Sequence, residues 1–458
     1  MSLERREFVE SFARDALDEH ISLFLGAGSS CSVGYPSWKE LFLPIAEELN
    51  IATDDFTDYY KMAQYYANTY GDEELRRKLK GSFKLNNCES DLLKEALSMG
   101  FSNVYTTNFD RTIEEFYERR GICVNALDSD SVFSEVDLKE HINVIKMNGD
   151  KGHLKSAVIT QNDYENYVDT HKVMLTFFKR DLISSTFLFV GYSFTDHLVL
   201  DCLSELNRYL KCSAGHHYAI IPNKPNDDTF KYFVEDLEKR YHVHVLVTKD
   251  HNEVPYILAD INQKIREKKV FISGAFSSFE PKIEKFSHEF ARSISEGLLQ
   301  EKYRIINGIG RRFGTHLIGY ANSYLAKNGT QNVERHLIIK PFVGNLDSSQ
   351  IEKKNARTEV LKQCSAAIFV FGEMDENSVD KTSGVWEEFE ISNEQHKVII
   401  PVSYEGMISE KIWNTVKDNI TRYPYLEGKL DKLTNNNPPN LIVKTILEIL
   451  KSAQAVNM

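Results

Sequence analysis

Residues Ile21 to Ser30 read ISLFLGAGSS, and residues Lys269 to Phe276 read KVFISGAF. In both stretches an apolar run stops at a glycine-containing turn. A strand, a tight glycine turn and then a helix is how an α/β nucleotide-binding sheet usually begins. Because this pattern occurs twice, about 250 residues apart, the sequence predicts two α/β domains with a boundary near residue 266. The first domain is expected to span residues 1–266 and the second residues 267–458.

Further apolar runs fit strands, and helical periodicity fills the gaps between them. Strands that alternate with helices predict a mainly parallel sheet in each domain, so the expected fold class is α/β with two Rossmann-like domains. The expected strands of the first domain are NVYTTNFD (103–110), INVIKMNGD (142–150), STFLFVGYS (185–193) and HHYAIIP (216–222). Those of the second are YRIINGIG (303–310), ERHLIIKPF (334–342), AAIFVFG (366–372) and KVIIPV (397–402).

Composition narrows the class of protein. The chain has 458 residues, 42% hydrophobic and 27% charged, which is the balance of a globular protein. Its 55 Lys and Arg against 67 Asp and Glu give a net charge of −12, which does not suit a protein that coats nucleic acid or an anionic membrane. No apolar run approaches the ~18 residues that span a bilayer, and the charged start MSLERREFVE is not a signal peptide. We expect a cytoplasmic protein with no nucleic-acid or membrane partner.

The cysteines exclude two kinds of site. All six lie far apart in the sequence and none forms a CxxC pair. A zinc knuckle built from neighbouring cysteines is therefore excluded, and a disulfide framework does not suit so large a chain. The sequence predicts no zinc and no metal site. The cysteines are Cys31, Cys88, Cys123, Cys202, Cys212 and Cys364.

Five motifs follow one another in the first domain. They are GAGSS (26–30), GYPSWKELF (34–42), TTNFD (106–110), KMNGD (146–150) and FVGYSFTD (189–196). Small residues at a strand-to-helix turn let backbone N–H groups approach a phosphate. Alone such a turn is weak evidence, because any α/β turn can use glycine for packing.

In this order and spacing, the motifs resemble the sirtuin-like (SIR2) superfamily over about residues 10 to 260. The missing CxxC zinc pairs make the chain more similar to the bacterial defence branch than to the protein deacylases. The resemblance implies NAD⁺ as substrate, with no cofactor required. It places the NAD⁺ diphosphate on Gly26, Ala27, Gly28 and Ser29, and makes Gly191 and Ser193 available to the nucleotide.

The same resemblance places Asn108 and Asp110 beside the nicotinamide ribose. Cleavage of the nicotinamide–ribose bond builds positive charge at the anomeric carbon, so the enzyme must position water and hold the ribose hydroxyls. An Asn amide can both donate and accept a hydrogen bond, which suits the ordering of that water. The alternative role for Asn108 is to cap the helix that follows TTNFD.

Asn148 departs from the family pattern, which has His before the Gly-Asp pair. An Asn cannot accept a proton at any useful pH, whereas a His can. Asn148 could be a natural variant that holds the ribose hydroxyls by hydrogen bonding, or an engineered substitution. A third alternative is that His153 supplies the imidazole. We treat Asn108, Asn148 and Asp110 as the candidate catalytic residues.

A second set of motifs resembles the SLOG family. It consists of KVFISGAF, INGIGRRFGTH (306–316), NARTEVLKQC (355–364) and SGVWEEFE (383–390). Glycines and arginine can hold phosphates, and a carboxylate can accept from ribose hydroxyls. The alternative role for Arg357 is a helix-surface salt bridge, and Glu387 and Glu388 are alternatives for the ribose contact. The candidate effector-binding residues are Ser273, Gly274, Gly308, Arg357, Glu387 and Glu388.

The whole chain is similar to the Thoeris antiphage effectors, in which a SIR2-like NADase precedes a SLOG domain. This resemblance implies activation by a cyclic ADP-ribose isomer made by a TIR-domain partner, assembly into a homotetramer or larger oligomer, and depletion of NAD⁺ in the infected cell. The alternative is a nucleotide-sensing oligomer whose hydrolysis Asn148 has disabled. Protein deacylation is disfavoured by the missing zinc cysteines.

Overall fold

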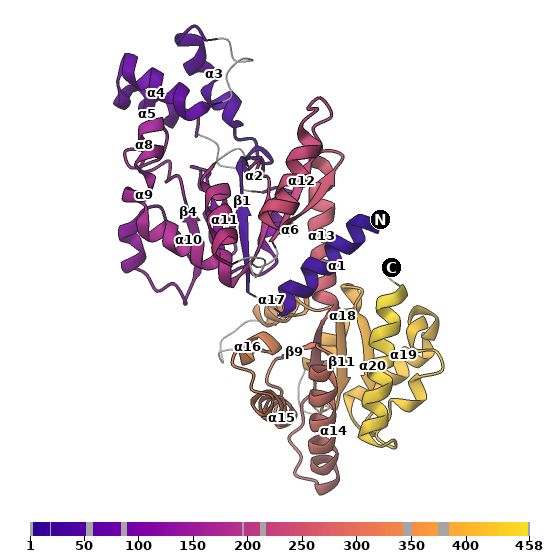
Figure 1. The fold of residues 1–458 in the computed structure, drawn as a ribbon. Coiled ribbons are helices and arrows are strands. Elements are labelled where there is room, and N and C mark those ends of the chain that lie inside the picture. Colours follow the sequence, from indigo (N-terminus) through magenta and orange to yellow (C-terminus); the bar gives the residue numbers. More distant parts are fainter. Residues whose placement is uncertain are drawn as a thin grey trace. The chain divides into compact units, whose positions relative to one another are not determined.

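A computed structural model describes residues 3–18, 20–51, 58–83, 89–194, 197–210, 217–341, 350–373 and 384–456. The chain divides into two compact units, residues 1–262 and 263–458. Each unit is a parallel α/β sheet with its own hydrophobic core, as the alternation of strands and helices predicts (Figure 1). Over the described residues, no helix combines the length and apolar character needed to cross a bilayer.

The first unit holds a seven-stranded sheet, counted over the described residues, with strand order β3-β4-β2-β1-β5-β6-β7. All of its strand pairs are parallel. The strands are β1 (Ile21–Leu25), β2 (Asn103–Thr106), β3 (Val124–Leu127), β4 (Ile142–Lys146), β5 (Thr186–Val190), β6 (His217–Pro222) and β7 (Val243–Thr248). The strands β3 and β7, which lie at the two edges of the sheet, were not predicted from the sequence.

The α-helices of the first unit lie between successive strands in the chain, except that the first precedes β1 and the last follows β7. They are α1 (Leu3–Asp18), α2 (Ala27–Cys31), α3 (Trp38–Glu48), α4 (Tyr59–Tyr70), α5 (Asp72–Lys80), α6 (Asp91–Leu97), α7 (Thr112–Glu118), α8 (Gln161–Glu165), α9 (Tyr167–Thr170), α10 (Lys172–Ser184), α11 (His197–Leu210), α12 (Phe230–Tyr241) and α13 (Val254–Glu267), with the 3-10 helices η1 (Asp130–Ser134) and η2 (His251–Glu253). Residues of α3, α4 and α5 share an apolar cluster of their own. The helix α13 continues across the boundary between the units and ends two residues before the next strand.

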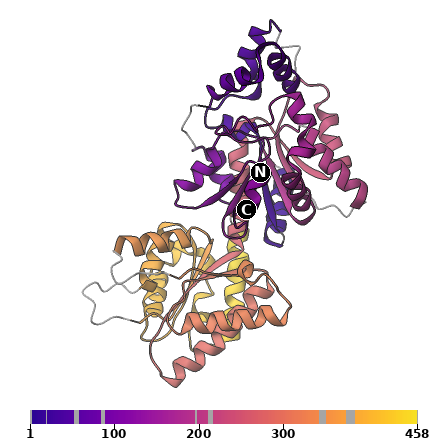
Figure 2. The ribbon, with the colours of Figure 1, turned by 90° about the vertical axis from the view of Figure 1, so that its left-hand side faces the viewer.

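The second unit holds a parallel five-stranded sheet, again over the described residues, with the order β10-β9-β8-β11-β12. In Figure 2 helices lie on both sides of these strands. The strands are β8 (Lys269–Ser273), β9 (Arg304–Asn307), β10 (Leu337–Ile339), β11 (Ala366–Val370) and β12 (Val398–Val402). The expected strand at 334–342 is shorter than predicted, because Val333–His336 forms the helix α16.

Seven α-helices are described in the second unit, and α14 contacts both α15 and α20 (Figure 1). They are α14 (Pro281–Gln300), α15 (Phe313–Lys327), α16, α17 (Gln350–Leu361), α18 (Gly384–Glu394), α19 (Ile408–Asp418) and α20 (Pro439–Val456), with the 3-10 helices η3 (Ile420–Arg422), η4 (Pro424–Leu426) and η5 (Leu430–Lys432).

The order of the strands in each sheet indicates where a ligand can bind. In an open α/β sheet, the crevice forms at the carboxyl ends of the strands, where the strand order reverses. In the first unit this point lies between β1 and β5, and in the second between β8 and β11. The glycine turns that follow β1 and β8 therefore both lie at a switch point.

Candidate active site and candidate effector site

Four of the motifs lie at the carboxyl ends of four adjacent strands in the first unit. The strand order β4-β2-β1-β5 brings together KMNGD, TTNFD, GAGSS and FVGYSF. Thr106 and Lys146 are register partners, so Asn108 and Asn148 each lie two residues beyond the same rung of the sheet. Thr195 and Asp196, the last residues of the fifth motif, lie outside the described residues.

Glycines bring the turns after β1 and β5 into backbone contact. A Cβ at Gly26 would lie 2.4 Å from the Gly191 carbonyl oxygen, and a Cβ at Gly28 would lie 2.9 Å from Gly191 Cα. Gly191 itself has φ +65°, and its Cβ would lie 2.7 Å from the Ser29 nitrogen. Neither turn can accept a side chain at these positions without moving the other.

The backbone donors of this turn are used within the fold. The Gly26 N–H donates to the Val190 carbonyl at 3.0 Å, and the Gly28 N–H donates to the Gly191 carbonyl at 2.9 Å. The Ser29 N–H donates to the Gly26 carbonyl at 3.0 Å. The glycines are thus accounted for by the contact between two turns, and these three N–H groups already have backbone acceptors.

Asn108 is buried where β2 and β1 end. Its Nδ2 donates to the Gly26 carbonyl at 3.0 Å and to Ser30 Oγ at 2.8 Å, and lies 3.3 Å from Ser29 Oγ. Because a carbonyl only accepts, the contact with Gly26 fixes which end of the amide faces the turn. Asn108 Oδ1 is buried and has no hydrogen-bond partner among the described residues. An acceptor in this state is available to a ligand or a water molecule.

Asp110, and not Asn108, holds the start of the next helix. Its Oδ1 accepts from the Thr112 N–H at 2.9 Å, at the first residue of α7. Its Oδ2 accepts from Ser30 Oγ at 2.6 Å. Ser30 therefore links Asn108 to Asp110, and both of these residues are buried. The helix-cap role that the sequence left open for Asn108 belongs to Asp110.

Ser30 is a site residue that the sequence analysis did not select. It lies in GAGSS next to Ser29, whose own Oγ donates to the Gly26 carbonyl at 2.8 Å. Two consecutive serines give no signal that distinguishes them. Only the packing of α2 against the TTNFD turn shows that Ser30 is the one that contacts Asp110. Ala27 is half-buried and Ser193 is exposed, two residues beyond Gly191.

Lys146 of the KMNGD turn forms an ion pair and a hydrogen bond that connect it to α7 and to the TTNFD turn. Its fully buried ammonium lies 3.0 Å from Glu114 Oε1 and 2.6 Å from Asp150 Oδ2. It also donates to the backbone carbonyl of Asp110. Burial lowers the pKa of Lys146, but Glu114 and Asp150 outweigh burial and raise it, so the side chain stays charged. From the sequence, Lys146 was no more than one residue of the KMNGD motif.

Asn148 is almost completely buried and contacts an aromatic group. Its Nδ2 donates to Tyr60 Oη at 3.1 Å. The Tyr60 ring lies 5.0 Å from Tyr164 and 6.0 Å from Trp38, measured between centroids. Trp38 begins α3 in the motif GYPSWKELF, so α3, α4 and α8 together hold the residue that contacts Asn148.

His153 forms a hydrogen bond with Asp128, which does not belong to this aromatic group. Its exposed ring places Nδ1 2.6 Å from Asp128 Oδ2, and this hydrogen bond raises the pKa of His153. Nothing among the described contacts brings the ring to Asn108 or Asn148, so the structure gives no support to His153 as a replacement for the family His.

The candidate effector residues gather on Glu388. Ser273 Oγ donates to Glu388 Oε2 at 2.5 Å, and Arg357 Nε lies 3.4 Å from Glu388 Oε1. Arg357 Nη1 contacts Glu387 Oε2 at 2.5 Å. The pKa of Glu388 is raised to about 7, because burial outweighs the contacts with Ser273 and Arg357. Three separate elements, β8, α17 and α18, supply this cluster.

Gly274 and Gly308 occupy the adjacent strand ends of the same sheet. Gly274 follows β8 and Gly308 follows β9. A Cβ at Gly274 would lie 2.7 Å from both the Phe313 ring and the Val370 carbonyl oxygen. Gly274 is therefore needed for close packing, and Gly308 is half-buried beside it.

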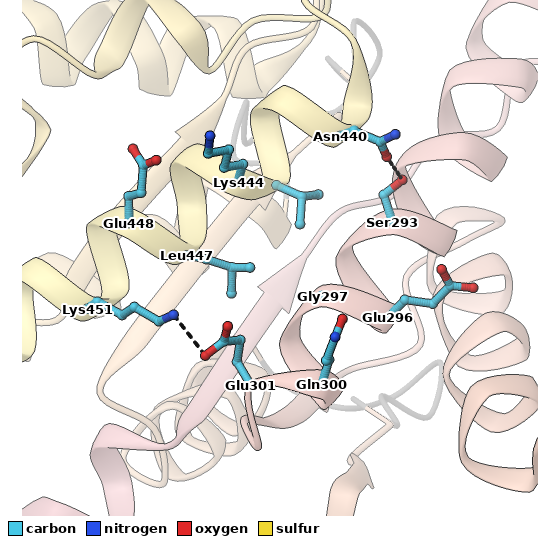
Figure 3. Close-up of a pocket in the computed structure, with 11 residues that line it drawn as sticks. Ser293, Glu296, Gly297, Gln300, Glu301, Asn440, Lys444, Leu447, Glu448 and Lys451 are labelled. Carbon is cyan, nitrogen blue, oxygen red and sulfur yellow. Dashed lines mark hydrogen bonds and ion pairs between the residues drawn. The ribbon is translucent and has the colours of Figure 1, made fainter. Parts of the chain in front are cut away.

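A surface pocket in the second unit contains none of the predicted residues. Figure 3 shows it between α14 and α20. Its volume is about 440 Å³. Ser293 Oγ donates to Asn440 Oδ1 at 2.8 Å at one end, and Lys451 pairs with Glu301 at 2.8 Å at the other. A Cβ at Gly297 would lie 2.8 Å from Val443, so this glycine lets the two helices approach closely.

Comparison with known proteins gives two domain families in this order. The model of the SIR2-like domain matches residues 102–246, and the model of the Sir2- and TIR-associating SLOG family matches residues 253–453. The NAD(+) hydrolase ThsA of Bacillus cereus (strain MSX-D12) is 29% identical, with 97% of each chain covered. The NAD(+) hydrolase ThsA of Acinetobacter baumannii (strain 532279) is 26% identical, with 98% of this chain and 99% of the relative covered.

A more distant relative matches half of the chain. The defense-associated sirtuin 2 of Bacillus subtilis is 23% identical over 239 residues, which are 50% of this chain and 23% of the relative. The matches to the ThsA proteins, in contrast, run along nearly the full length of both chains. The chain therefore has a match to the SIR2-like domain in its first unit and a match to the SLOG family in its second, and it is similar from end to end to the NAD(+) hydrolases named ThsA.

Proposed function

We propose that this protein is an NAD⁺ glycohydrolase of antiphage defence that releases nicotinamide and ADP-ribose. Residues 1–266 form the hydrolytic domain and residues 267–458 the sensor domain. The observation that carries the proposal is that Asn108 Oδ1 is buried without a hydrogen-bond partner among the described residues. Asn108 follows β2, next to the other strands whose carboxyl ends carry the motifs. The names of the full-length relatives support the choice of NAD⁺ as substrate.

The reaction breaks the bond between the anomeric carbon of the ribose and the pyridinium nitrogen. The bonding electron pair moves to the nitrogen, which leaves as neutral nicotinamide, and positive charge develops on the sugar. A water molecule then adds its oxygen to the anomeric carbon and loses a proton to solvent. Acceptors that are already in place stabilise this charge better than solvent that must reorganise.

Asn108 is assigned the role of holding that water. Its donor end is committed to Gly26 and Ser30, so the amide cannot rotate freely. Its acceptor end is buried without a partner among the described residues and can take one hydrogen of a water held in the site. Asp110 holds Ser30 in turn, and its buried carboxylate adds negative charge close to the developing cation.

The nucleotide is assigned to the turns after β1 and β5. Gly26, Ala27, Gly28, Ser29, Gly191 and Ser193 form this part of the site. Because the N–H groups of Gly26, Gly28 and Ser29 are used within the fold, the contribution of the glycines is to keep the crevice free of side chains. Asn148 donates a hydrogen bond to Tyr60 Oη, and we assign to it the contact with the ribose hydroxyls.

The second domain is assigned a sensor role. Arg357 supplies the positive charge that a diphosphate needs in a chain of net charge −12. Ser273, Gly274, Gly308, Glu387 and Glu388 complete the site, with one carboxylate for a ribose hydroxyl. The ligand is a cyclic ADP-ribose isomer made by a TIR-domain protein. The name of the matching family, Sir2- and TIR-associating SLOG, supports this choice.

Binding must favour one of two states in order to switch the enzyme on, since a ligand with equal affinity for both shifts nothing. We assign this switch to a homotetramer or larger assembly. The protein acts in the cytoplasm and needs no nucleic acid, membrane or cofactor for hydrolysis.

The test of the enzyme is release of nicotinamide from NAD⁺ by the full chain, with and without cyclic ADP-ribose isomers. Asn108→Ala removes the acceptor and should abolish release, while its thermal unfolding shows whether the fold survives. No release by the unchanged chain under any condition would instead support the alternative, a sensing oligomer that Asn148 has disabled. Release that requires an acetylated peptide would indicate a deacylase.

A further inference from the structure

Two histidines and a glutamate come together on α14 and α15, outside both candidate sites. Glu284 and His288 are four residues apart on α14, so they share one face of the helix. His316 lies on α15, which packs against α14. Glu284 Oε2 lies 3.8 Å from His288 Nε2 and 3.7 Å from His316 Nε2. One ligand atom from each residue lies within 4.8 Å of the others.

The opposite nitrogen of each imidazole is held by a hydroxyl. His316 Nδ1 lies 2.8 Å from Ser287 Oγ, and His288 Nδ1 lies 3.1 Å from Tyr320 Oη. Metal-binding histidines usually have this arrangement, in which an outer partner fixes the ring and its tautomer. When each Nδ1 donates outward, both Nε2 lone pairs are directed to the side of Glu284.

We propose that Glu284, His288 and His316 bind a divalent transition-metal ion of the zinc class. Two imidazole nitrogens and one carboxylate oxygen form a donor set that suits Zn²⁺, whereas Ca²⁺ and Mg²⁺ prefer oxygen ligands alone. Ligand atoms about 2.0–2.1 Å from a tetrahedral ion lie roughly 3.3 Å from one another. The two separations from Glu284 Oε2 to the histidine nitrogens must therefore shorten by about half an ångström.

Two features of the cluster determine how its side chains must move when a metal ion binds. The two imidazole rings are stacked with centroids 3.8 Å apart and planes at 25°, so they must turn apart to direct both lone pairs at one ion. Arg312 contacts the other oxygen of Glu284, Oε1, which makes Glu284 a ligand through Oε2 alone. The positive charge of Arg312 also weakens the attraction of a cation, so we expect a reversible site.

The proposed site runs against the prediction of no zinc and no metal site. That prediction rested on the lack of cysteine pairs in CxxC, which this chain does not have. His288 and His316 are 28 positions apart and belong to no zinc motif, so only the packing of two helices brings them together. The fourth position of a tetrahedral ion here would be taken by water.

The test uses the untagged full chain after treatment with a chelator, titrated with ZnCl₂ in a calorimeter. The expected result is one Zn²⁺ per chain. CoCl₂ provides a second probe, since Co²⁺ in a four-coordinate site absorbs visible light far more strongly than six-coordinate Co²⁺ in water. His288→Ala is the principal variant, because the His288 ring is half exposed and its loss should leave the fold intact.

We expect His288→Ala and Glu284→Gln to weaken Zn²⁺ binding by at least the ~10–100-fold that loss of an outer partner costs, and Tyr320→Phe to weaken it within that range. His251→Ala, which removes an exposed histidine of the first unit, is the control and should bind as before. Unchanged affinity in His288→Ala, no one-to-one binding by the unchanged chain, or a six-coordinate Co²⁺ spectrum would each overturn the proposal.

Discussion

Asn108 donates through Nδ2 to Ser30 Oγ at 2.8 Å, and the same hydroxyl donates to Asp110 Oδ2 at 2.6 Å. Ser30 thus carries a hydrogen bond from the amide to the carboxylate, and the acceptor end of Asn108 is left free. One hydroxyl on α2 holds together the two candidate catalytic residues of the TTNFD turn. This relationship connects the GAGSS motif to both candidate catalytic residues of the TTNFD turn.

Replacing Ser30 with Ala should lower kcat for NAD⁺ hydrolysis by about 10-fold and change KM little. The loss of a buried hydrogen bond to a charged group costs about 1.5–3 kcal/mol, and part of it would appear as poorer orientation of Asn108. The measurement is steady-state release of nicotinamide. Ser32→Ala, on the same helix end but exposed, is the control. A change in KM alone would assign Ser30 to substrate binding.

Replacing Asn148 with His should raise the release of nicotinamide. The imidazole can accept a proton, and Tyr60 Oη, 3.1 Å from the present amide, offers it a hydrogen-bond partner. Asn148→Ala is the matched control, because it removes the contact with Tyr60 and adds no base. Equal or lower turnover in Asn148→His would contradict the expectation and would favour a natural role for the amide in holding the ribose.

Replacing Gly191 with Ala should lower the free energy of unfolding of the first unit by more than the cost of placing an alanine at the positive φ of Gly191. The conformation costs an alanine about 1 kcal/mol, and the new Cβ would also lie 2.7 Å from the Ser29 nitrogen. Gly121→Ala is the control, since Gly121 has φ +70° and nothing within 4 Å of its Cβ position. Urea unfolding of both variants measures the difference. Equal losses would mean that the two turns can separate at no cost.

Replacing Arg357 with Ala should abolish activation by a cyclic ADP-ribose isomer and leave the fold intact. The variant loses the cation that faces Glu387 and Glu388, and with it the charge assigned to the diphosphate. Arg422→Ala, an exposed arginine of η3, is the control. The measurement is NAD⁺ loss against ligand concentration. A normal response in Arg357→Ala would remove this residue from the sensor site.

Glu388 should make the stability of the second unit depend on pH. Burial raises the pKa of Glu388 in the folded chain to about 7, from an ordinary value of 4.5. Glu388 then binds more protons in the folded state than in the unfolded state between these values, so the stability that it contributes is fully present below pH 4.5 and is lost as the pH rises through 7. At about 1.4 kcal/mol for each pH unit, the loss is on the order of 3 kcal/mol.

Glu388→Gln should remove this pH dependence, because the amide keeps the shape of the carboxyl group and does not titrate. Unfolding in urea at several pH values, followed by the fluorescence of Trp386 and Trp413, measures the effect in the second unit. Glu387→Gln, at a more exposed carboxylate, is the control. Parallel curves for the unchanged chain and Glu388→Gln would show that Glu388 has the same pKa in the folded and the unfolded chain.

The sequence by itself determined the parts of each sheet that depend on local pattern. Apolar runs that stop at glycine or polar turns located β1, β2, β4, β5 and β8, because a buried parallel strand needs an unbroken apolar segment. The sequence missed the edge strands β3 and β7, whose burial is less complete. It also overextended β10, because the apolar run at 337–339 is only three residues long.

Only the tertiary structure decided how these parts meet. The order β4-β2-β1-β5 depends on crossover connections, which no local pattern records, and it is this order that gathers Asn148, Asn108, Gly26 and Gly191 at one edge. The contact between Ser30 and Asp110 and the cluster of Glu284, His288 and His316 each join residues from different elements. The residue types and their spacing can be read from the sequence. Which residues approach one another and which become buried depends on tertiary packing. Approach and burial then decide which polar atoms remain without a partner and can bind a ligand.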